Sequence, residues 1–183
     1  EAMLRERIPP ADIGQDPLNI PRLSELFDTL SPTQPGAAAG AEMACVELAA
    51  RMCNVSLCEY LGGALQESVE FNGWIGMLPA EEAAAEAKRW LKAGFCSAKI
   101  KVGGGLGGGW AGVPAVREAV GSAMKLRIDA NMLYDADTSL KLCRMVKEFD
   151  LQLFEQPARI DDLAGMARVR REGGIPVMAD ESV

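Results

Sequence analysis

The sequence predicts an α/β fold in which parallel strands alternate with helices, and two observations support this prediction. First, from residue 64 onward short apolar runs alternate with segments of helical periodicity, which is typical of buried strands covered by helices. Second, the run at Leu151 starts 25 residues after the run at Leu126, and the run at Val177 starts 26 residues later. An open doubly wound sheet and a (β/α) barrel both satisfy this repeat, so periodicity leaves two architectures open.

Five strands and four helices are expected in this repeating part. Pro79 opens the first helix and Gly94 ends it, because proline suits the first turn of a helix and glycine suits its end. Asp137 is expected to cap the third helix, and Asp161 or Asp162 the fourth, since a carboxylate accepts hydrogen bonds from free main-chain N–H groups. The strands are expected at residues 69–75, 98–102, 126–130, 151–154 and 177–179, and the short second helix around residues 114–120.

Residues 1–63 carry a different pattern, which is helical throughout. Prolines and a glycine mark a loop at residues 31–36, and the segment after it has apolar residues at helical spacing. Six residues predict one buried stripe on this helix: Ala41, Ala44, Cys45, Leu48, Ala49 and Met52. No strand is expected before residue 63, so the chain is expected to divide into residues 1–63 and residues 64–183.

The composition is that of an ordinary globular protein, and it excludes several classes of function. Of the 183 residues, 49% are hydrophobic and 25% are charged, and 19 Lys and Arg against 26 Asp and Glu give a net charge of −7. An acidic chain without a basic block is a poor ligand for nucleic acid. No apolar stretch reaches the ~20 residues of a membrane-spanning helix, and the first residues lack the apolar core of a signal peptide. A cytoplasmic protein is therefore expected.

Histidine is absent and the five cysteines form no Cys-x-x-Cys motif, which narrows the available chemistry. Without histidine, Ser-His-Asp catalysis, Cys-His catalysis and most zinc sites are excluded. The odd number of cysteines predicts small buried side chains in a reducing compartment rather than disulfides. Acid–base chemistry must come from Lys, Asp, Glu, Tyr or Cys.

Three carboxylates follow consecutive strands at the point where each strand ends. Asp129, Glu155 and Asp180 hold these positions, and the carboxyl ends of parallel strands meet at one edge of a sheet. Three unneutralised carboxylates at one place would repel each other strongly. A divalent cation between them removes the repulsion, and oxygen ligands alone favour a hard ion such as Mg²⁺. The alternative, that Asp129 and Asp180 are helix N-caps, explains Glu155 less well.

Two lysines, Lys99 and Lys101, end the strand before these carboxylates. Their i, i+2 spacing places both on one face of the strand, toward the expected metal. Neighbouring ammonium groups disfavour each other's charge, so the pKa of at least one lysine is expected to fall and leave a neutral amine as general base. A solvated strand end is the alternative. Two roles remain possible for Asn131, a turn residue or an auxiliary residue of the site. Glu181 is expected to point away from Asp180 and to be a structural partner.

A glycine-rich stretch, residues 103–109, follows the strand that carries the lysines. It superficially resembles the dinucleotide-binding pattern G-x-G-x-x-G, which requires an acidic residue about 20 residues further on. Asp129 stands near that distance, but it belongs to the better-supported carboxylate set. A flexible loop is therefore favoured over a nucleotide site.

Four motifs in order resemble the enolase superfamily in its muconate-lactonizing-enzyme branch, the mandelate racemase/muconate lactonizing enzyme family. They are Lys-Ile-Lys-Val-Gly at 99–103, Arg-Ile-Asp-Ala-Asn at 127–131, Phe-Glu-Gln-Pro at 154–157 and Met-Ala-Asp-Glu-Ser at 178–182. The resemblance implies a partial (β/α) TIM-like barrel of about five βα units in residues 64–183. Residues 1–63 are then the helical remainder of an α+β capping domain. The capping β-meander and the last barrel strands, with a second lysine, are expected outside these 183 residues.

The resemblance also assigns roles to the site residues. Asp129, Glu155 and Asp180 become Mg²⁺ ligands, Lys101 becomes the base that removes the proton alpha to a substrate carboxylate, and Lys99 its electrostatic partner. This chemistry gives a metal-stabilised enolate of a small carboxylic acid. Racemisation, epimerisation or loss of water is expected to follow, and cycloisomerisation is less favoured. The resemblance therefore implies an isomerase or a lyase.

The alternative hypothesis is that the chain is a catalytically inactive barrel fragment that acts as an association module. A part of a barrel exposes two open strand edges and an apolar face, and both favour contact with another chain. A homo-oligomer is expected on the same grounds. The expected small-molecule partner is a small carboxylate, and neither nucleic acid nor a membrane is expected as a partner.

Overall fold

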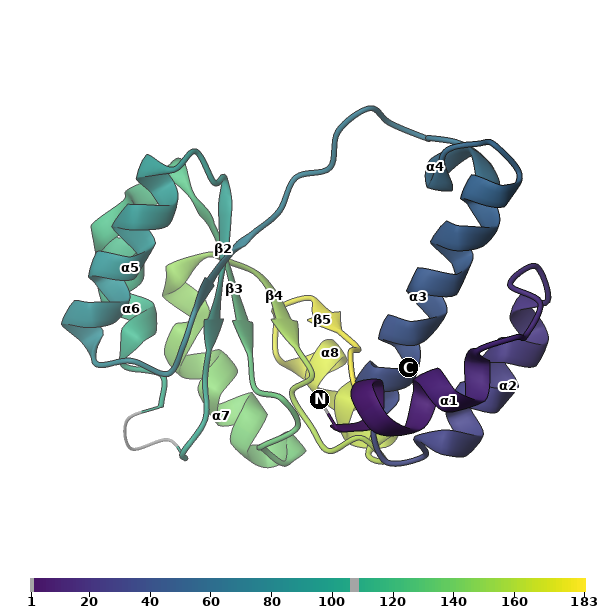
Figure 1. Ribbon diagram of the computed structural model, residues 1–183. Helices are drawn as coiled ribbons and strands as arrows, with labels where there is room; N and C mark the ends of the chain where they lie inside the picture. The colour runs from purple at the N-terminus through teal and green to yellow at the C-terminus, as the bar shows by residue number, and fades with distance from the viewer. Residues whose placement is uncertain (1, 106–108) are drawn as a thin grey trace. The chain divides into compact units, whose positions relative to one another are not determined.

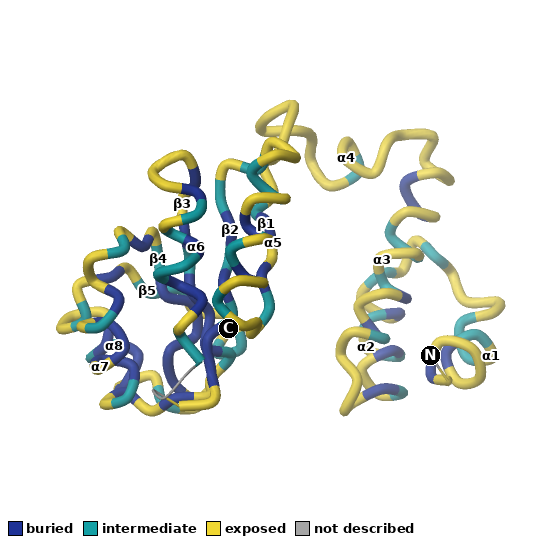
Figure 2. The backbone as a smooth tube through the Cα atoms, turned by 90° about the vertical axis from the view of Figure 1, so that its left-hand side faces the viewer, coloured by how far each residue is buried: buried dark blue, intermediate teal, exposed yellow. Residues whose placement is uncertain are grey.

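The computed structural model describes residues 2–105 and 109–183, and the chain forms two compact units that divide between Val69 and Glu70. The division lies shortly after the glycine pair at residues 62–63, where the helical pattern of the sequence ends. Each unit has a hydrophobic cluster of its own, and Figure 2 shows the buried positions along the backbone in dark blue. No helix in the described residues is long and apolar enough to cross a bilayer.

The first unit consists of helices joined by turns. They are a π-helical turn Met3–Arg7, α1 (Ile8–Asp12), α2 (Ile20–Leu30), α3 (Pro35–Met52) and α4 (Leu57–Tyr60). The side chain of Asn19 accepts a hydrogen bond from the N–H of Arg22 at 3.3 Å and so caps α2. Leu23 and Phe27 of α2 are buried in one cluster with Ala38 of α3. As expected, the described residues before residue 63 contain no strand.

Helix α3 differs from the prediction in its start and in its buried face. It begins at Pro35, inside the expected loop, because proline is well tolerated in the first turn of a helix. Ala41 and Ala49 are buried as expected, but Leu48 and Met52 are 49% and 56% exposed. The residues of α3 in the cluster with α2 are small, namely Ala37, Ala38, Ala41 and Cys45, and they allow close approach of the two helices. Leu48, Met52 and also Ala44, which was expected to be buried, remain exposed.

The second unit is a parallel sheet with a helix after each of its first four strands. The strands are β1 (Gly73–Ile75), β2 (Ser97–Lys101), β3 (Lys125–Asp129), β4 (Leu151–Glu155) and β5 (Val177–Met178). The helices are α5 (Ala80–Lys92), α6 (Gly112–Val120), α7 (Ala136–Val146) and α8 (Leu163–Glu172), with 3₁₀ turns at Gly121–Ala123 and Lys147–Phe149. The strands are all parallel, and their order in the sheet follows the order in the chain (Figure 1).

The strand order decides between the two architectures that periodicity left open. A doubly wound sheet reverses its strand order at a switch point and carries helices on both faces, whereas each new strand of a (β/α) barrel joins the same edge. Here the order does not reverse, and right-handed crossovers then put every helix on one face. Ala87 of α5, Val116 of α6, Leu142 of α7 and Val169 of α8 share one buried cluster with Ile128 of β3. The second unit is therefore part of a (β/α) barrel.

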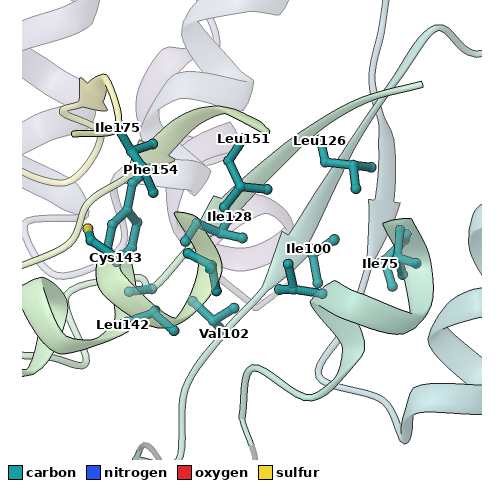
Figure 3. Packing of buried hydrophobic residues seen from close by; sticks show 14 of the residues in the cluster. Ile75, Ile100, Val102, Leu126, Ile128, Leu142, Cys143, Leu151, Phe154 and Ile175 are labelled. Carbon is teal, nitrogen blue, oxygen red and sulfur yellow. The ribbon is translucent and has the colours of Figure 1, made fainter. Parts of the chain in front are cut away.

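The two faces of the sheet differ in what they contact. Ile75, Ile100, Ile128 and Phe154 stand in register on four neighbouring strands, are at most 2% exposed, and pack in the cluster under the helices (Figure 3). Side chains alternate in direction along a strand. The residues between these four, among them Lys99, therefore lie on the face that a closed barrel turns toward its axis.

Strand β1 is shorter than predicted. It begins at Gly73 rather than at residue 69, and Val69 and Phe71 are 66% and 76% exposed. The pairing of β1 with β2 begins at Gly73, so the apolar residues before it have no neighbouring strand. An apolar run predicts a strand only where a partner is available, and the local pattern does not contain that information.

The helix caps agree with the prediction at α8 and differ at α7. The carboxylate of Asp162, one of the two candidates, accepts a main-chain N–H at 2.8 Å and caps α8. At α7 the cap is Asp135, which accepts a main-chain N–H at 2.7 Å, and not Asp137. Asp137 lies in the first turn and pairs with Arg168 at 2.8 Å. A capping residue has non-helical backbone angles, and Asp135 has them, whereas Asp137 is already inside the helix.

Arg117 of α6 joins the turns at the amino-terminal side of the sheet. Its guanidinium donates hydrogen bonds of 2.6–3.1 Å to four main-chain carbonyls, those of Gly121, Met124, Phe149 and Asp150. Hydrogen bonds from a charged donor contribute about 1.5–3 kcal/mol. We therefore expect Arg117→Met to lower the free energy of unfolding by about 2 kcal/mol in urea denaturation. Arg144→Met, at an exposed position of α7, should change it by less than about 0.5 kcal/mol, and equal losses in both variants would contradict this role.

Candidate active site

Four of the charged residues predicted for the carboxyl end of the sheet lie together, namely Lys99, Lys101, Asp129 and Glu155. Lys101, Asp129 and Glu155 occupy matching positions on β2, β3 and β4, so their side chains point to the same face. Asp129 is 0% and Glu155 is 3% exposed. Lys99 stands two residues before Lys101 on the same face. Asp180 is in the exposed segment that follows β5.

The two lysines contact the two buried carboxylates directly. Lys99 Nζ lies 2.7 Å from Glu155 Oε1 and 3.2 Å from Asp129 Oδ2. Lys101 Nζ lies 2.5 Å from Asp129 Oδ2 and 2.6 Å from Asn131 Oδ1. Each buried carboxylate therefore has a cation within hydrogen-bond distance, which is the condition under which a buried charge is tolerated.

The two buried carboxylates have pKa values shifted in opposite directions. Burial alone would raise the pKa of Asp129, but hydrogen bonds from Lys101, from a main-chain N–H and from Lys99 outweigh burial and hold it below its ordinary value. Burial raises the pKa of Glu155, and the negative charges of Asp129 and Asp180 add to this, against the hydrogen bond from Lys99. Asp180 is thus close enough to Glu155 to act on it electrostatically.

The expected fall in lysine pKa is not found at Lys99. Burial lowers the pKa of Lys99, but hydrogen bonds to Glu155 and Asp129, together with their charges, raise it above its ordinary value. The prediction required a lowered pKa for at least one of the two lysines, and Lys99 is not that lysine, because the carboxylates opposite it stabilise its charge. Lys99 remains a cation, which suits an electrostatic role in the site.

The carboxylates at this edge provide oxygen ligands for a hard cation. As the side chains stand, no three Asp, Glu or Cys residues in the described ranges converge closely enough to enclose a metal, and lysine ammonium groups lie against the oxygens of Asp129 and Glu155. The donor set nevertheless fits Mg²⁺, because it contains oxygen alone. The charge of Asp180 also raises the pKa of Glu155, a repulsion that a divalent cation would relieve.

Asn131 lies in a turn and also contacts the lysine. Its φ is 42°, its main-chain N–H donates to Asp129 Oδ1 at 2.8 Å, and its side-chain oxygen accepts from Lys101. Its side-chain nitrogen donates to Glu181 Oε1 at 2.9 Å. The contact with Asn131 is compatible with Glu181 as a structural partner. The other carboxylate oxygen of Glu181 is buried without a hydrogen bond to the described residues.

Sequence reasoning missed one residue of this site, Gln156. It directly follows Glu155, is 0% exposed and has a φ of 38°. Its side-chain oxygen accepts hydrogen bonds from the N–H groups of Asp180 and Ser182. The motif Phe-Glu-Gln-Pro contains the one available signal, because a glutamine that follows a buried strand requires hydrogen-bond partners.

A small cavity of about 120 Å³ lies beside Lys101. Its lining is mostly apolar or small: Gly76, Met77, Leu78, Ile100, Lys101, Gly109 and Gly112. The backbone approaches closely here, since a Cβ added to Gly103 would lie 2.8 Å from both Met77 Sδ and Leu133 Cδ1. The cavity thus offers both polar and apolar surface beside Lys101.

The interpretation of residues 103–109 as a flexible loop is only partly covered by the structure, because residues 106–108 lie outside the described residues. Asp129, the acidic residue that a dinucleotide fingerprint would need, contacts Lys99 and Lys101. That contact supports the assignment of Asp129 to the carboxylate set.

Comparison with known proteins identifies the family. A family model described as "Enolase C-terminal domain-like" matches residues 82–183. Among curated proteins, the chain is similar to a hydrophobic dipeptide epimerase of Enterococcus faecalis, with 35% identity over 172 residues, which are 94% of this chain and 48% of that protein. The chain spans about half the length of the curated relatives it matches.

Solved structures agree with this assignment. The L-Ala-D/L-Glu epimerase from Bacillus subtilis, in a substrate-liganded complex, is 33% identical with a TM-score of 0.86, over 100% of this chain and 51% of that chain. The dipeptide epimerase from Enterococcus faecalis complexed with Mg and L-Leu-L-Tyr is 34% identical with a TM-score of 0.86, over 98% and 51%. The matched family model, the relatives and the barrel topology together show that the chain belongs to the enolase superfamily, in the mandelate racemase/muconate lactonizing enzyme family.

Proposed function

We propose that the complete protein is a racemase or epimerase that removes the proton alpha to the carboxylate of a small acid. The observation that carries this proposal is the position of Lys101, whose amine stands at the carboxyl edge of a barrel sheet 2.5 Å from the buried carboxylate of Asp129. Relatives that are epimerases or racemases support isomerisation over loss of water as the outcome. An o-succinylbenzoate synthase and a 3,6-anhydro-alpha-L-galactonate cycloisomerase match less of this chain, 65% and 58%, so other outcomes have weaker support.

A dipeptide with an apolar side chain is the proposed substrate. Two structures of relatives are described as complexes with Mg and a dipeptide, L-Leu-L-Tyr in one and D-Ala-L-Val in the other. In this chain, Met77 and Leu78 are among the residues that line the cavity beside Lys101. An apolar side chain buried there would lose its contact with water, which favours binding by about 25 cal/mol per Å² of apolar surface.

Asp129, Glu155 and Asp180 are the residues that would hold a magnesium ion. When bound, the ion would offset negative charge on the substrate carboxylate as the alpha proton leaves. The chain's own groups have separate tasks. Lys101 accepts the proton at Nζ once its own ammonium group has released one, and Lys99 keeps its positive charge beside Glu155 and Asp129. Inversion also requires an acid on the opposite face of the substrate, a role that the family resemblance assigns to a lysine outside residues 1–183.

Exchange of the alpha proton in D₂O tests this function. The complete protein is incubated with a panel of L,L-dipeptides with apolar side chains and with acidic dipeptides, and the α-proton signals are followed by NMR. With Mg²⁺ we expect exchange and the appearance of the epimer, with apolar dipeptides fastest, and with a chelator we expect at least a 100-fold slower rate. Absence of exchange with every dipeptide, or equal exchange in the chelator, would refute the proposal.

The association module stays the competing hypothesis, and the homo-oligomer and the cytoplasmic location stay predictions. Sedimentation of the complete protein measures the oligomer directly. If the protein self-associates but exchanges no alpha proton, the association module is the better description of its function.

A further inference from the structure

The side chain of Gln156 connects the segments that carry the candidate metal ligands. Its oxygen accepts hydrogen bonds from the N–H of Asp180 at 3.0 Å and from the N–H of Ser182 at 3.3 Å. Its nitrogen donates to Ser182 Oγ at 2.7 Å and to the carbonyl of Ala158 at 3.0 Å. The side chain is 0% exposed, so these partners within the protein replace water for both ends of the amide.

The main chain of Gln156 also forms hydrogen bonds, with β5 and with the segment that follows β3. Its N–H donates to the carbonyl of Met178 in β5 at 2.9 Å, and its carbonyl accepts from the N–H of Met132 at 3.1 Å. Residue 156 thus contacts the segments after β3 and after β5 and directly follows Glu155. Its φ of 38° is in the left-handed region that favours glycine. A glutamine at such a position indicates that the side chain is needed there, because glycine would relieve the backbone strain.

Asp180 depends on this connection more than the other two carboxylates do. Asp129 and Glu155 are on regular strands and are buried, so the sheet positions them. Asp180 is two residues beyond the end of β5 and is exposed. Its charge and that of Glu155 repel each other, and the hydrogen bond from its N–H to Gln156 keeps its main chain near Glu155.

We propose that Gln156 is a positioning residue that holds Asp180 beside Asp129 and Glu155 for divalent-cation binding, an inference that rests on the proposed function. Only an amide meets all the contacts, since a carboxylate cannot donate to Ala158 and an apolar side chain cannot accept from Asp180. Gln156 itself contributes no ligand atom in this assignment. It acts through the main chain of residues 180–182.

Gln156→Met in the complete protein tests the proposal, because methionine has a similar size and no hydrogen-bonding amide. In the magnesium-free protein, we expect the main-chain amides of Asp180 and Ser182 to exchange with D₂O at least 10-fold faster than in the unaltered protein. The dissociation constant for Mg²⁺, measured by calorimetry, should rise about 10- to 100-fold, the usual effect of losing a group that orients a metal ligand.

Ser139→Ala is the matched control. Ser139 is also 0% exposed, and its hydroxyl donates to the carbonyl of Pro157 in the same loop. If loss of any buried hydrogen bond in this loop weakened Mg²⁺ binding, both variants would bind Mg²⁺ more weakly. The proposal instead predicts that Ser139→Ala keeps the Mg²⁺ dissociation constant within about twofold and leaves the Asp180 amide protected from exchange. Equal Mg²⁺ affinity in the Gln156→Met variant and the unaltered protein would overturn the proposal.

If the Gln156→Met variant does not fold, a second variant, Gln156→Glu, still tests the proposal. Glutamate retains an oxygen that accepts from Asp180 and Ser182 in either protonation state, so the Asp180 amide should stay protected. Exchange of this amide as fast as that of an exposed loop would overturn the proposal. Failure of the unaltered protein to bind Mg²⁺ would instead refute the proposed function, and amide exchange at Asp180 would still decide whether Gln156 holds this segment.

Discussion

In the complete protein, Lys101→Ala is expected to slow alpha-proton exchange by about 10²- to 10⁴-fold, the contribution typical of a general base. Lys101 Nζ is held 2.5 Å from Asp129 Oδ2 and 2.6 Å from Asn131 Oδ1, so the amine stands beside the proposed ligands. Alanine removes the proton acceptor and leaves the carboxylates in place. The rate is measured by NMR, from the loss of the dipeptide α-proton signal in D₂O.

Magnesium affinity separates the loss of a base from the loss of the site. The Lys101→Ala variant should bind Mg²⁺ at least as tightly as the unaltered protein, because Asp129 loses a competing cation. Lys125→Ala makes the same change at the exposed start of β3 and should keep the full exchange rate. Weakened Mg²⁺ binding in the Lys101→Ala variant, or exchange at the unaltered rate, would show that the role of Lys101 is misassigned.

Phe154→Ala is expected to lower the free energy of unfolding of the second unit by about 3–5 kcal/mol, the usual cost of removing a buried aromatic ring. Phe154 is 0% exposed and packs in the cluster between the sheet and its helices (Figure 3). The cavity left behind loses both hydrophobic burial and packing contacts. Urea denaturation followed by tryptophan fluorescence measures this unit alone, because Trp74, Trp90 and Trp110 all lie in it.

Phe71→Ala is the control for this substitution. Phe71 belongs to the same unit but is 76% exposed, so its replacement should change the free energy of unfolding by less than about 0.5 kcal/mol. Similar losses for the two variants would contradict the assignment of the core to the helix-covered face of the sheet.

Element positions in the second unit could be predicted because each strand is a short apolar run and each helix has an apolar stripe. The ends of elements were harder to predict. Residues 69–72 have apolar character but no neighbouring strand, and the choice between Asp135 and Asp137 as the cap of α7 depended on backbone angles. In α3, Leu48 and Met52 share the spacing of buried residues, yet the α3 residues that pack in the cluster with α2 are the alanines at 37, 38 and 41 and Cys45.

The part of the candidate site that consists of charged residues at strand ends could be predicted from the sequence. Lysines and carboxylates at the ends of successive strands are recognisable in sequence, and Lys101, Asp129 and Glu155 do meet in register. The pKa direction of Lys99 could not be predicted, because it is set by ion pairs with residues 30 and more positions away in the chain. Gln156 was missed because its partners are main-chain groups of residues 158 and 180–182.

The sequence by itself determined the alternation of strands and helices, the family, and the charged residues that stand at the strand ends. These are local properties, which depend on side-chain type and spacing. The tertiary structure alone decided the length of β1, the ion pairs that raise the pKa of Lys99, and the hydrogen bonds of Gln156 to the segment of Asp180. These depend on distances between residues far apart in the chain, which only the packing of helices on one face of the sheet brings together.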